Sequence, residues 1–273
     1  MIPVPGKSAD TVKIHLTYKH KLSNNGQSRG YLTINQKLYT FDGELFREIK
    51  YNETNSQIDN YIFYFYKNGR LSSKEQYNGQ DSLNFIDHYE YNTPNLVSQI
   101  TRYQLIDGKL LPIQRTVTLY NQQGKPTSVK IIFGKKTGKQ TTCTYNDKGL
   151  LLNETTKFKQ AAKDTLKLLN KSYTYNLNGR IEGIVTTVKN SDNKTFVYSE
   201  TCSYNEKGLL TQVRKSDSNN NLLETIRYSY LNSGALSIYE VKNQNGLVTE
   251  LMQYDYKKHY MERGTQVSRY ENF

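Results

Sequence analysis

The chain repeats one short pattern eight times: an aromatic residue, a turn residue four positions later, and an apolar or Pro residue two positions after that. The eight triplets are Tyr39–Gly43–Leu45, Phe65–Gly69–Leu71, Tyr91–Asn95–Val97, Tyr120–Gly124–Pro126, Tyr145–Gly149–Leu151, Tyr175–Gly179–Ile181, Tyr204–Gly208–Leu210 and Tyr230–Gly234–Leu236. Successive turn residues are 26, 26, 29, 25, 30, 29 and 26 positions apart. A repeat of this length is one supersecondary unit that buries its apolar face by stacking on neighbours, so the pattern predicts a repeat protein.

The turn within each repeat can be assigned from its residues. Five turns begin with Asn and reach the turn residue three positions later: Asn92–Asn95, Asn121–Gly124, Asn146–Gly149, Asn176–Gly179 and Asn205–Gly208. Asn can bond its own backbone two residues on, and Gly supplies the positive φ of a G1 bulge. This pattern predicts a three-residue hairpin loop between antiparallel strands, distorted in the third repeat by Pro94. Each motif aromatic then lies opposite its motif apolar residue, a pair that stabilises the sheet by roughly 0.2–1 kcal/mol.

Strand alternation extends this aromatic face away from the turn. The residues two positions before the motif aromatics, which we expect on the same face, are Phe63, Tyr89, Cys143, Tyr173, Cys202 and Tyr228. Variable polar loops join the other ends of the strands, at Asp107–Gly108, Lys135–Lys139, Asn190–Asn193 and Ser216–Asn221. The longest insert, Phe158–Leu168, has the composition for one helical turn but lacks a cap.

The two ends of the chain extend the same architecture. Val12 to Tyr18 alternate apolar and polar residues and predict a strand, Tyr31–Leu38 returns as its partner, and Tyr254–Tyr256 begin an unfinished ninth unit that acts as a cap. We therefore predict an all-β fold: one large antiparallel meander of about 16–18 strands, built from hairpin repeats into an elongated, twisted and curled sheet. Residues 1–273 form one β-hairpin-repeat domain, with eight full units over residues 37–260.

Composition favours a thin sheet over a thick two-layer core. Only 36% of residues are apolar, Trp is absent, and 24 Tyr supply most of the large side-chain surface. Tyr suits a partly wet strand face, because its ring packs while its hydroxyl reaches water or a partner. Low hydrophobicity with a net charge of +12 is also typical of disorder, but the regular aromatic spacing argues against that reading.

The net positive charge permits contact with nucleic acid, an anionic glycan or a lipid headgroup surface. The densest clusters are Lys135, Lys136 and Lys139, and Lys257, Lys258 and His259. The other basic residues are spread evenly, which favours solubility and the blocking of exposed strand edges over a dedicated anion site. No nucleic-acid partner is expected, because the basic residues are not interleaved with aromatics in any local patch.

The histidines and cysteines do not form an evident reactive site. His15 and His20 lie five apart on or near one strand and point to opposite faces, and His88 and His259 are remote, so no metal site is predicted. Cys143 and Cys202 hold the same position in the fifth and seventh repeats, four strand spacings or about 19 Å apart, too far for a disulfide. We predict two buried, reduced thiols on the aromatic face.

Catalytic motifs are also missing. The chain has no Gly-x-Ser-x-Gly, P-loop, dinucleotide fingerprint or His-Glu-x-x-His. The carboxylates Asp42, Asp147, Glu206 and Asp217 fall mostly in turns, where solvation explains them, although a pair of carboxylates meeting across strands is not excluded. No catalytic, cofactor-binding or metal residue is therefore predicted, no cofactor and no enzyme activity are expected, and the binding residues are unknown.

The segments Tyr173-Thr-Tyr-Asn-Leu-Asn-Gly-Arg-Ile, Tyr145-Asn-Asp-Lys-Gly-Leu-Leu and Tyr204-Asn-Glu-Lys-Gly-Leu-Leu resemble the YD repeat of the Rhs family, over about residues 37–260. Family members typically carry Asp after the second Tyr, where five repeats here carry Asn, and their spacing is shorter. The resemblance implies a β-strand spiral outside the cytoplasm or at the cell surface, with a role in binding or encapsulation. The frequent Asn, Lys and Tyr would fit a Bacteroidetes-type envelope protein.

Compartment and function follow from this resemblance as expectations. Met1-Ile-Pro-Val-Pro is not a signal peptide, so the chain is either cytosolic or a mature form whose leader was replaced. We favour the second reading: a periplasmic, secreted or surface protein, such as a lipoprotein. The leading function is a non-catalytic scaffold that binds a protein partner at the envelope. The alternative is a carbohydrate-binding module that uses exposed Tyr on the face opposite the motif, such as Tyr64 and Tyr66.

A membrane-spanning protein is not expected. No apolar run is long enough for a membrane helix. Membrane strands would need one wholly apolar face, whereas the outward positions here carry Lys, Asn, Gln and Glu.

Overall fold

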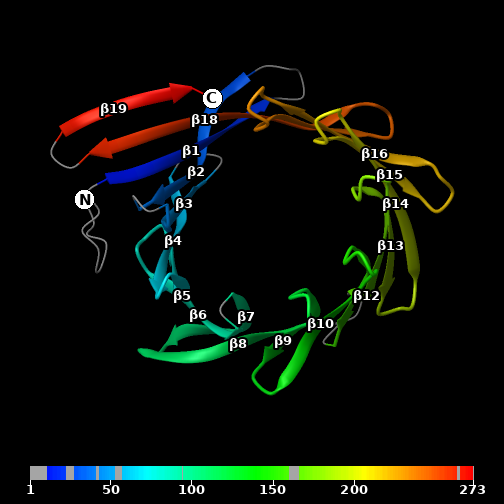
Figure 1. Cartoon of the computed structure of the whole chain (residues 1–273), viewed down its shortest axis with the longest axis horizontal. Coiled ribbons are helices and arrows are strands. Elements are labelled where there is room, and N and C mark those ends of the chain that lie inside the picture. The colour runs from blue at the N-terminus through cyan, green and yellow to red at the C-terminus, as the bar shows by residue number, and fades with distance from the viewer. Residues whose placement is uncertain are drawn as a thin grey trace. The chain divides into compact units, whose positions relative to one another are not determined.

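The part of the chain that the computed structural model describes is all-β, as predicted, with 19 strands in one antiparallel sheet (Figure 1). It describes residues 11–22, 28–40, 43–52, 57–93, 95–159, 166–262 and 265–272, and the side chains of 35–40, 43–52, 57–93, 95–159 and 167–252. The strands are β1 (Thr11–Leu22), β2 (Ser28–Tyr39), β3 (Leu45–Tyr51), β4 (Ile58–Lys67), β5 (Arg70–Asn78), β6 (Leu83–Thr93), β7 (Leu96–Ile106), β8 (Lys109–Tyr120), β9 (Pro126–Phe133), β10 (Lys136–Tyr145), β11 (Leu151–Phe158), β12 (Leu166–Tyr175), β13 (Ile181–Asn190), β14 (Thr195–Tyr204), β15 (Leu210–Asp217), β16 (Leu222–Tyr230), β17 (Leu236–Asn243), β18 (Val248–Glu262) and β19 (Thr265–Asn272).

The chain divides into two compact units. Unit 1 comprises residues 1–87, 230–238 and 251–273, and unit 2 comprises residues 88–229 and 239–250. The single domain expected over residues 1–273 stays a prediction. The helical turn considered for Phe158–Leu168 falls largely on residues 160–165, outside the described part of the chain.

In unit 1 the strands β1 to β5 pair in sequence order. β1 also pairs with β18, from Thr11↔Glu262 to Lys21↔Met252, so it lies between β2 and β18. Tyr254–Tyr256, expected to begin a ninth unit that does not finish its turn, lie within β18, which continues to Glu262 and then pairs with β19; their role as a cap stays a prediction. Pairing between strands so distant in sequence depends on tertiary contacts that a local pattern does not record.

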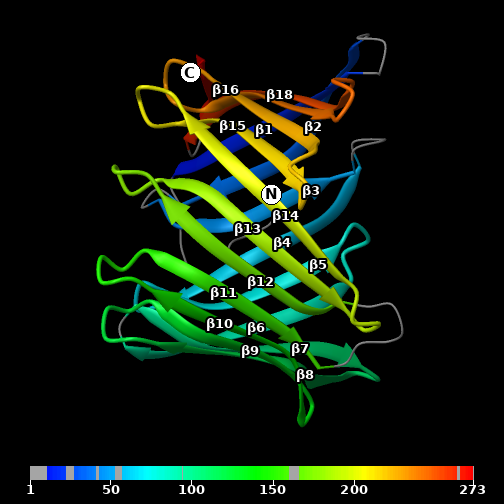
Figure 2. The ribbon, with the colours of Figure 1, turned by 90° about the vertical axis from the view of Figure 1, so that its right-hand side faces the viewer.

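In unit 2 the strands β7 to β16 also pair in sequence order, and β11 to β15 lie side by side in Figure 2. The predicted turn is present. In the fifth repeat the Gly149 amide donates to the Asn146 carbonyl, the Asn146 amide donates to the Leu150 carbonyl, and Gly149 has a φ of 72°. The Asn146 side-chain oxygen accepts the Leu150 amide at 2.8 Å. The same backbone bonds close the turns at Gly43, Gly124, Gly179, Gly208 and Gly234.

The loops at the other end of the strands use this turn too, which the sequence analysis did not recognise. Asn78, Asn190, Asp217 and Asn243 start four of them with the same pair of backbone bonds. In three of these turns Asp81, Asn193 and Asn220 take the positive φ in place of Gly. Asn and Asp tolerate that conformation better than other residues with a Cβ, so their short side chains concealed the repeated geometry.

The predicted cross-strand pairs are confirmed at five repeats: Tyr39↔Leu45, Tyr120↔Pro126, Tyr145↔Leu151, Tyr175↔Ile181 and Tyr204↔Leu210. Each pair is followed by a second irregularity that the sequence analysis missed. The residue just after the motif apolar residue is left without a partner, as a β-bulge at Phe46, Thr127, Leu152, Glu182 and Thr211. Bulges of this kind bend a strand and increase its twist.

The second repeat departs from the prediction. Asn68 and Gly69, with φ of 53° and 69°, form a two-residue turn, so Tyr66 and not Phe65 lies opposite Leu71. An Asn-Gly pair is the strongest signal for such a turn, and the shorter loop shifts the register by one residue. Phe63 and Phe65 therefore lie on the face opposite the motif, and Phe63 is a wrong member of the predicted aromatic face.

The described side chains form a thin core. The buried apolar residues are Phe46, Ile49, Tyr61, Ile86, Val213 and Val241. Five polar side chains are equally buried, including Thr156 and Thr186, and no large side chain among those described is fully enclosed. A sheet of this kind gains most of its stability from neighbouring strands and side chains, so the contacts between repeats determine the fold.

Candidate functional site

The motif tyrosines are occupied in joining one repeat to the next. The hydroxyls of Tyr66, Tyr120, Tyr145, Tyr175 and Tyr204 donate at 2.7–3.0 Å to the carbonyls of Leu45, Val97, Pro126, Leu151 and Ile181, each the motif apolar residue of the preceding repeat. Pairing with the strand of the next repeat begins only two residues after each carbonyl, as at Asn153↔Ser172 and Gly183↔Thr201, so the hydroxyl bonds a carbonyl that lies outside that ladder. The motif side chains are thus structural, and a binding surface must be sought elsewhere.

The turns also contact one another along the sheet in unit 2. The residue after the turn Gly packs over the next turn: the Lys125 ammonium lies 5.7 Å from the ring centre of Tyr145 and donates to the Gly149 carbonyl. Likewise the Arg180 guanidinium lies 5.8 Å from the ring centre of Tyr204 and fills the space where a Cβ on Gly208 would lie. These glycines are needed for this close approach as well as for their positive φ.

The two thiols are free and lie on the motif face, where they are half-buried rather than buried as predicted. Burial raises the pKa of both, and the negative charge of Glu154 raises the pKa of Cys143 further, as Glu200 does for Cys202. A reactive thiol needs the opposite environment, since its thiolate is the nucleophile. This environment keeps the thiols protonated at neutral pH.

The other residues considered for chemistry do not come together. Among the described side chains, no group of three or more His, Cys, Asp and Glu is arranged to hold a metal ion. The His88 ring packs against Tyr103 at 5.0 Å, while His15, His20 and His259 lie outside the described side chains. The part of the chain that the structure describes contains no helix with the length and hydrophobicity needed to cross a membrane.

The face of unit 2 opposite the motif tyrosines takes no part in these contacts between motif tyrosines and carbonyls. Exposure alternates along the strands: Thr142, Thr144, Ser172 and Thr174 are exposed, while the intervening Cys143 is half-buried. The strand registers place the following residues of β10–β16 on this side, which we call the hydroxyl face: Gln140, Thr142, Thr144, Asn153, Thr155, Lys157, Leu168, Asn170, Ser172, Thr174, Gly183, Val185, Thr187, Lys189, Thr195, Val197, Ser199, Thr201, Ser203, Gln212, Arg214, Ser216, Thr225 and Arg227.

The hydroxyl face combines many hydroxyl side chains with a few basic ones. Twelve of its 24 residues are Ser or Thr, and its ionisable side chains are Lys157, Lys189, Arg214 and Arg227. Hydrogen bonds link its members across strands, from Asn153 to Thr144 at 3.3 Å and from Ser172 to Asn153 at 2.8 Å. Ser and Asn side chains supply adaptable hydrogen bonds to a bound protein.

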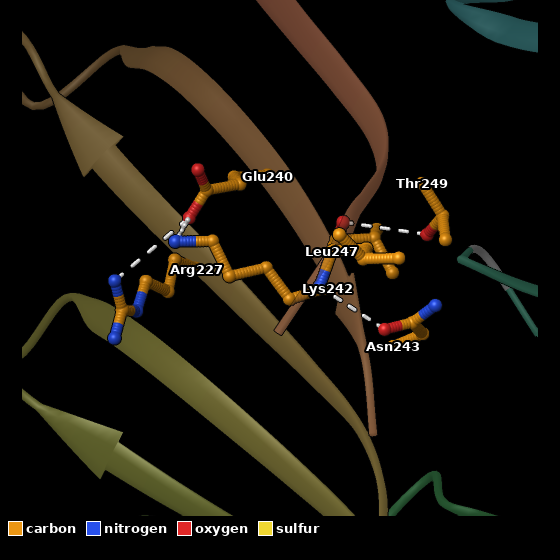
Figure 3. A network of polar contacts seen from close by, with 7 residues as sticks. Arg227, Glu240, Lys242, Asn243, Leu247 and Thr249 are labelled. Atoms are coloured by element: carbon orange, nitrogen blue, oxygen red, sulfur yellow. Dashed lines mark hydrogen bonds and ion pairs between the residues drawn. The ribbon is translucent and has the colours of Figure 1, made fainter. Parts of the chain in front are cut away.

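An ion-pair network partly neutralises the edge of this face (Figure 3). Arg227 lies 3.9 Å from Glu240, and Lys242 lies 3.1 Å from the same carboxylate oxygen. In the adjoining turn, at the end of β17, the Asn243 side chain accepts the Leu247 amide at 3.1 Å. Glu240 thus offsets the charge of Arg227, while Lys157, Lys189 and Arg214 keep the hydroxyl face basic.

Unit 1 carries an aromatic cluster on the corresponding face, opposite the motif. The rings of Tyr61 and Tyr77 stack at 5.1 Å, Phe63 meets both edge-on, and the Arg47 guanidinium lies 4.8 Å from the Tyr61 ring centre. The Nε of Arg47 is buried and has no hydrogen-bond partner among the described residues. The Tyr61 hydroxyl donates to Asp81 at 2.6 Å.

Burial, together with these acceptors, sets the ionisation of the cluster. Burial and the hydrogen bond to Asp81 raise the pKa of Tyr61 to about 12, and burial and Glu75 raise the pKa of Tyr77 to about 12. Both phenols are therefore neutral donors at physiological pH.

The tyrosines suggested for sugar stacking do not lie on this face. Tyr64 and Tyr66 lie on the motif face, half-buried, and their hydroxyls donate to Glu48 and to the Leu45 carbonyl. Burial raises the pKa of Glu48, but hydrogen bonds from Asn35 and Tyr64 and the charges of two lysines outweigh it, so its pKa is lowered. The register shift at Asn68–Gly69 exchanged the two faces, and that dipeptide was the signal that could have revealed it.

Comparison with known proteins identifies no family. No family model matches the chain, and no curated protein matches it. A porin-like protein from Bacteroides vulgatus is 10% identical over 88% of this chain and 98% of its own, with a TM-score of 0.41. A porin-like protein from Bacteroides uniformis is 12% identical over 92% of this chain and 99% of its own, also with a TM-score of 0.41. The resemblance to YD-repeat proteins stays a prediction.

Proposed function

We propose that the chain is a non-catalytic β-repeat scaffold that binds a protein partner at the cell envelope, outside the cytoplasm, through the hydroxyl face of unit 2. The observation that carries this proposal is that the two faces of unit 2 differ in their contacts and exposure. The motif face is occupied by contacts between repeats, whereas the opposite face carries Ser and Thr from β10 to β16, and those exposed on β10, β12 and β14 include Thr142, Thr144, Ser172, Thr174, Thr201 and Ser203. The raised pKa of both thiols argues against Cys143 and Cys202 as nucleophiles.

Added charge on this face tests the proposal. Thr142→Glu, Thr174→Glu and Thr201→Glu, made singly and together, place a carboxylate on exposed strand positions, where the cost to folding is below about 1 kcal/mol. Ser218→Glu adds the same charge in an exposed turn and is the control. Each tagged variant is expressed in the cells from which the protein comes, crosslinked to the proteins that it binds there, and purified by its tag. We expect the triple variant to fold normally and lose a partner that the control retains; unchanged recovery would contradict the proposal.

A carbohydrate-binding module is the second candidate, favoured by the aromatic cluster of unit 1. Tyr61 is buried, so the half-buried rings of Phe63 and Tyr77, beside the Arg47 guanidinium, are the part of the cluster that a sugar could contact through apolar faces and hydrogen bonds. A glycan array with Arg47→Met separates the two candidates. A sugar signal that this substitution removes supports the module, and an array without signal refutes it.

A further inference from the structure

The tip of the β7–β8 hairpin is the most apolar exposed segment of unit 2. All eight residues from Leu105 to Pro112 are exposed, and Leu105 and Leu110 are each 48% accessible. Asp107 and Gly108, with φ of 50° and 74°, form the two-residue turn between Ile106 and Lys109. Single exposed apolar residues are ordinary, but four large aliphatic side chains on one tip form a contiguous patch of the kind that marks an interaction site.

The hairpin extends beyond its neighbour in the sheet. The pairing of β8 with β9 ends at Arg115↔Ile132, whereas the pairing of β7 with β8 continues to Ile106↔Lys109. The six residues from Lys109 to Gln114 therefore extend past β9 by on the order of 20 Å.

Both faces of this tip are apolar. Leu105 and Leu110 are paired and share one face, while Ile106 and Leu111 lie on the other. A groove on a protein would cover one face of a hairpin. A lipid headgroup layer surrounds both faces, so the two-sided pattern favours a membrane surface.

Charge favours an anionic surface. The neighbouring β9–β10 hairpin ends in Phe133, which is 48% exposed, followed by Gly134 and the exposed Lys135 and Lys136. Together with Lys109 these three lysines face one acid at the two tips, Asp107, a balance of +2 (three minus one). Basic residues beside exposed aliphatic and aromatic side chains are typical of segments that lie in the headgroup region.

We propose that the β7–β8 tip, residues Leu105 to Leu111, inserts into the headgroup region of an anionic lipid bilayer, while Lys135 and Lys136 contact the lipid phosphates. The chain would then lie on a membrane through one end of unit 2 and leave the hydroxyl face open.

Vesicle co-sedimentation of the full chain tests this proposal, with phosphatidylcholine vesicles that contain or lack phosphatidylglycerol. We expect binding to the anionic vesicles, at least about tenfold weaker binding to the neutral ones, and weakening by salt. Leu105→Ser with Leu110→Ser should reduce binding at least about tenfold. Leu177→Ser, which alters a fully exposed Leu in a motif turn, should have no effect.

The results separate the two proposals. The Leu105→Ser and Leu110→Ser variant should keep the partner bound by the hydroxyl face, and the Thr→Glu variants should keep vesicle binding. Absence of binding to anionic vesicles, equal binding to both kinds, or binding unchanged by the two Ser substitutions would each overturn the membrane proposal. Capture of a protein by the tip without any vesicle binding would overturn it as well.

Discussion

Removal of one motif hydroxyl tests the contact that joins the repeats. In Tyr175→Phe the ring stays, and the 2.7 Å hydrogen bond to the Leu151 carbonyl is lost. The pairing of β11 with β12 begins only at Asn153↔Ser172, so no strand amide replaces the hydroxyl at this carbonyl. A neutral hydrogen bond contributes about 0.5–1.5 kcal/mol, and an unsatisfied buried acceptor costs about 1–3 kcal/mol. Because Tyr175 is half-buried and water can reach the site, we expect a loss of about 1–2 kcal/mol.

The measurement is thermal and urea denaturation followed by circular dichroism. For a chain of this size the expected loss lowers the melting temperature by about 2–6 °C. Tyr173→Phe is the matched control, because this hydroxyl lies on the same strand and face and forms no hydrogen bond among the described residues. Tyr145→Phe combined with Tyr204→Phe should lower stability additively, since the sites are well separated. Equal losses for Tyr173→Phe and Tyr175→Phe would refute the proposed role of the hydroxyl.

Three further predictions concern the phenols, a turn and the thiols. The pKa values of Tyr61 and Tyr77 are raised to about 12, so the folded state holds their protons more tightly, and stability should fall as pH rises from about 10 through 12, measured by urea denaturation and by phenolate absorbance. Gly208→Ala should destabilise more than Gly234→Ala, because both have positive φ but only the first displaces the Arg180 guanidinium; equal urea midpoints would contradict this. The two thiols, whose pKa values are raised, should react with a disulfide reagent more slowly than unfolded protein at neutral pH, and a faster reaction would count against their environment.

The sequence was sufficient to predict the repeat, the all-β fold class and the turn within each repeat. Asn146 and Gly149 occupy positions with specific backbone demands, so spacing and residue type together determine that geometry. The cross-strand pairing of Tyr145 with Leu151 then follows from the loop length alone.

The β-bulges, the contacts between repeats and the exposed hairpin tip were not predicted, because the residue type at a single position indicates them only weakly. The bulge residues Leu152, Glu182 and Thr211 have no chemistry in common, because a bulge constrains the backbone more than the side chain. The link from Tyr175 to the preceding repeat was indicated by the preference for Tyr over Phe in seven of the eight triplets. The exposed apolar tip of the β7–β8 hairpin was not predicted, because Asp107–Gly108 indicates a polar turn and the aliphatic residues beside it form no motif.

The central claim is that the two faces of unit 2 have separate roles, one structural and one for binding. Photo-crosslinking from adjacent residues tests it most directly, because Thr174 lies on the hydroxyl face and Tyr173 on the motif face of the same strand. A photoreactive residue is placed at each position in turn, and the source cells are irradiated. We predict intermolecular adducts from position 174 and none from position 173. Adducts from position 173 alone, or equal adducts from both, would contradict the account.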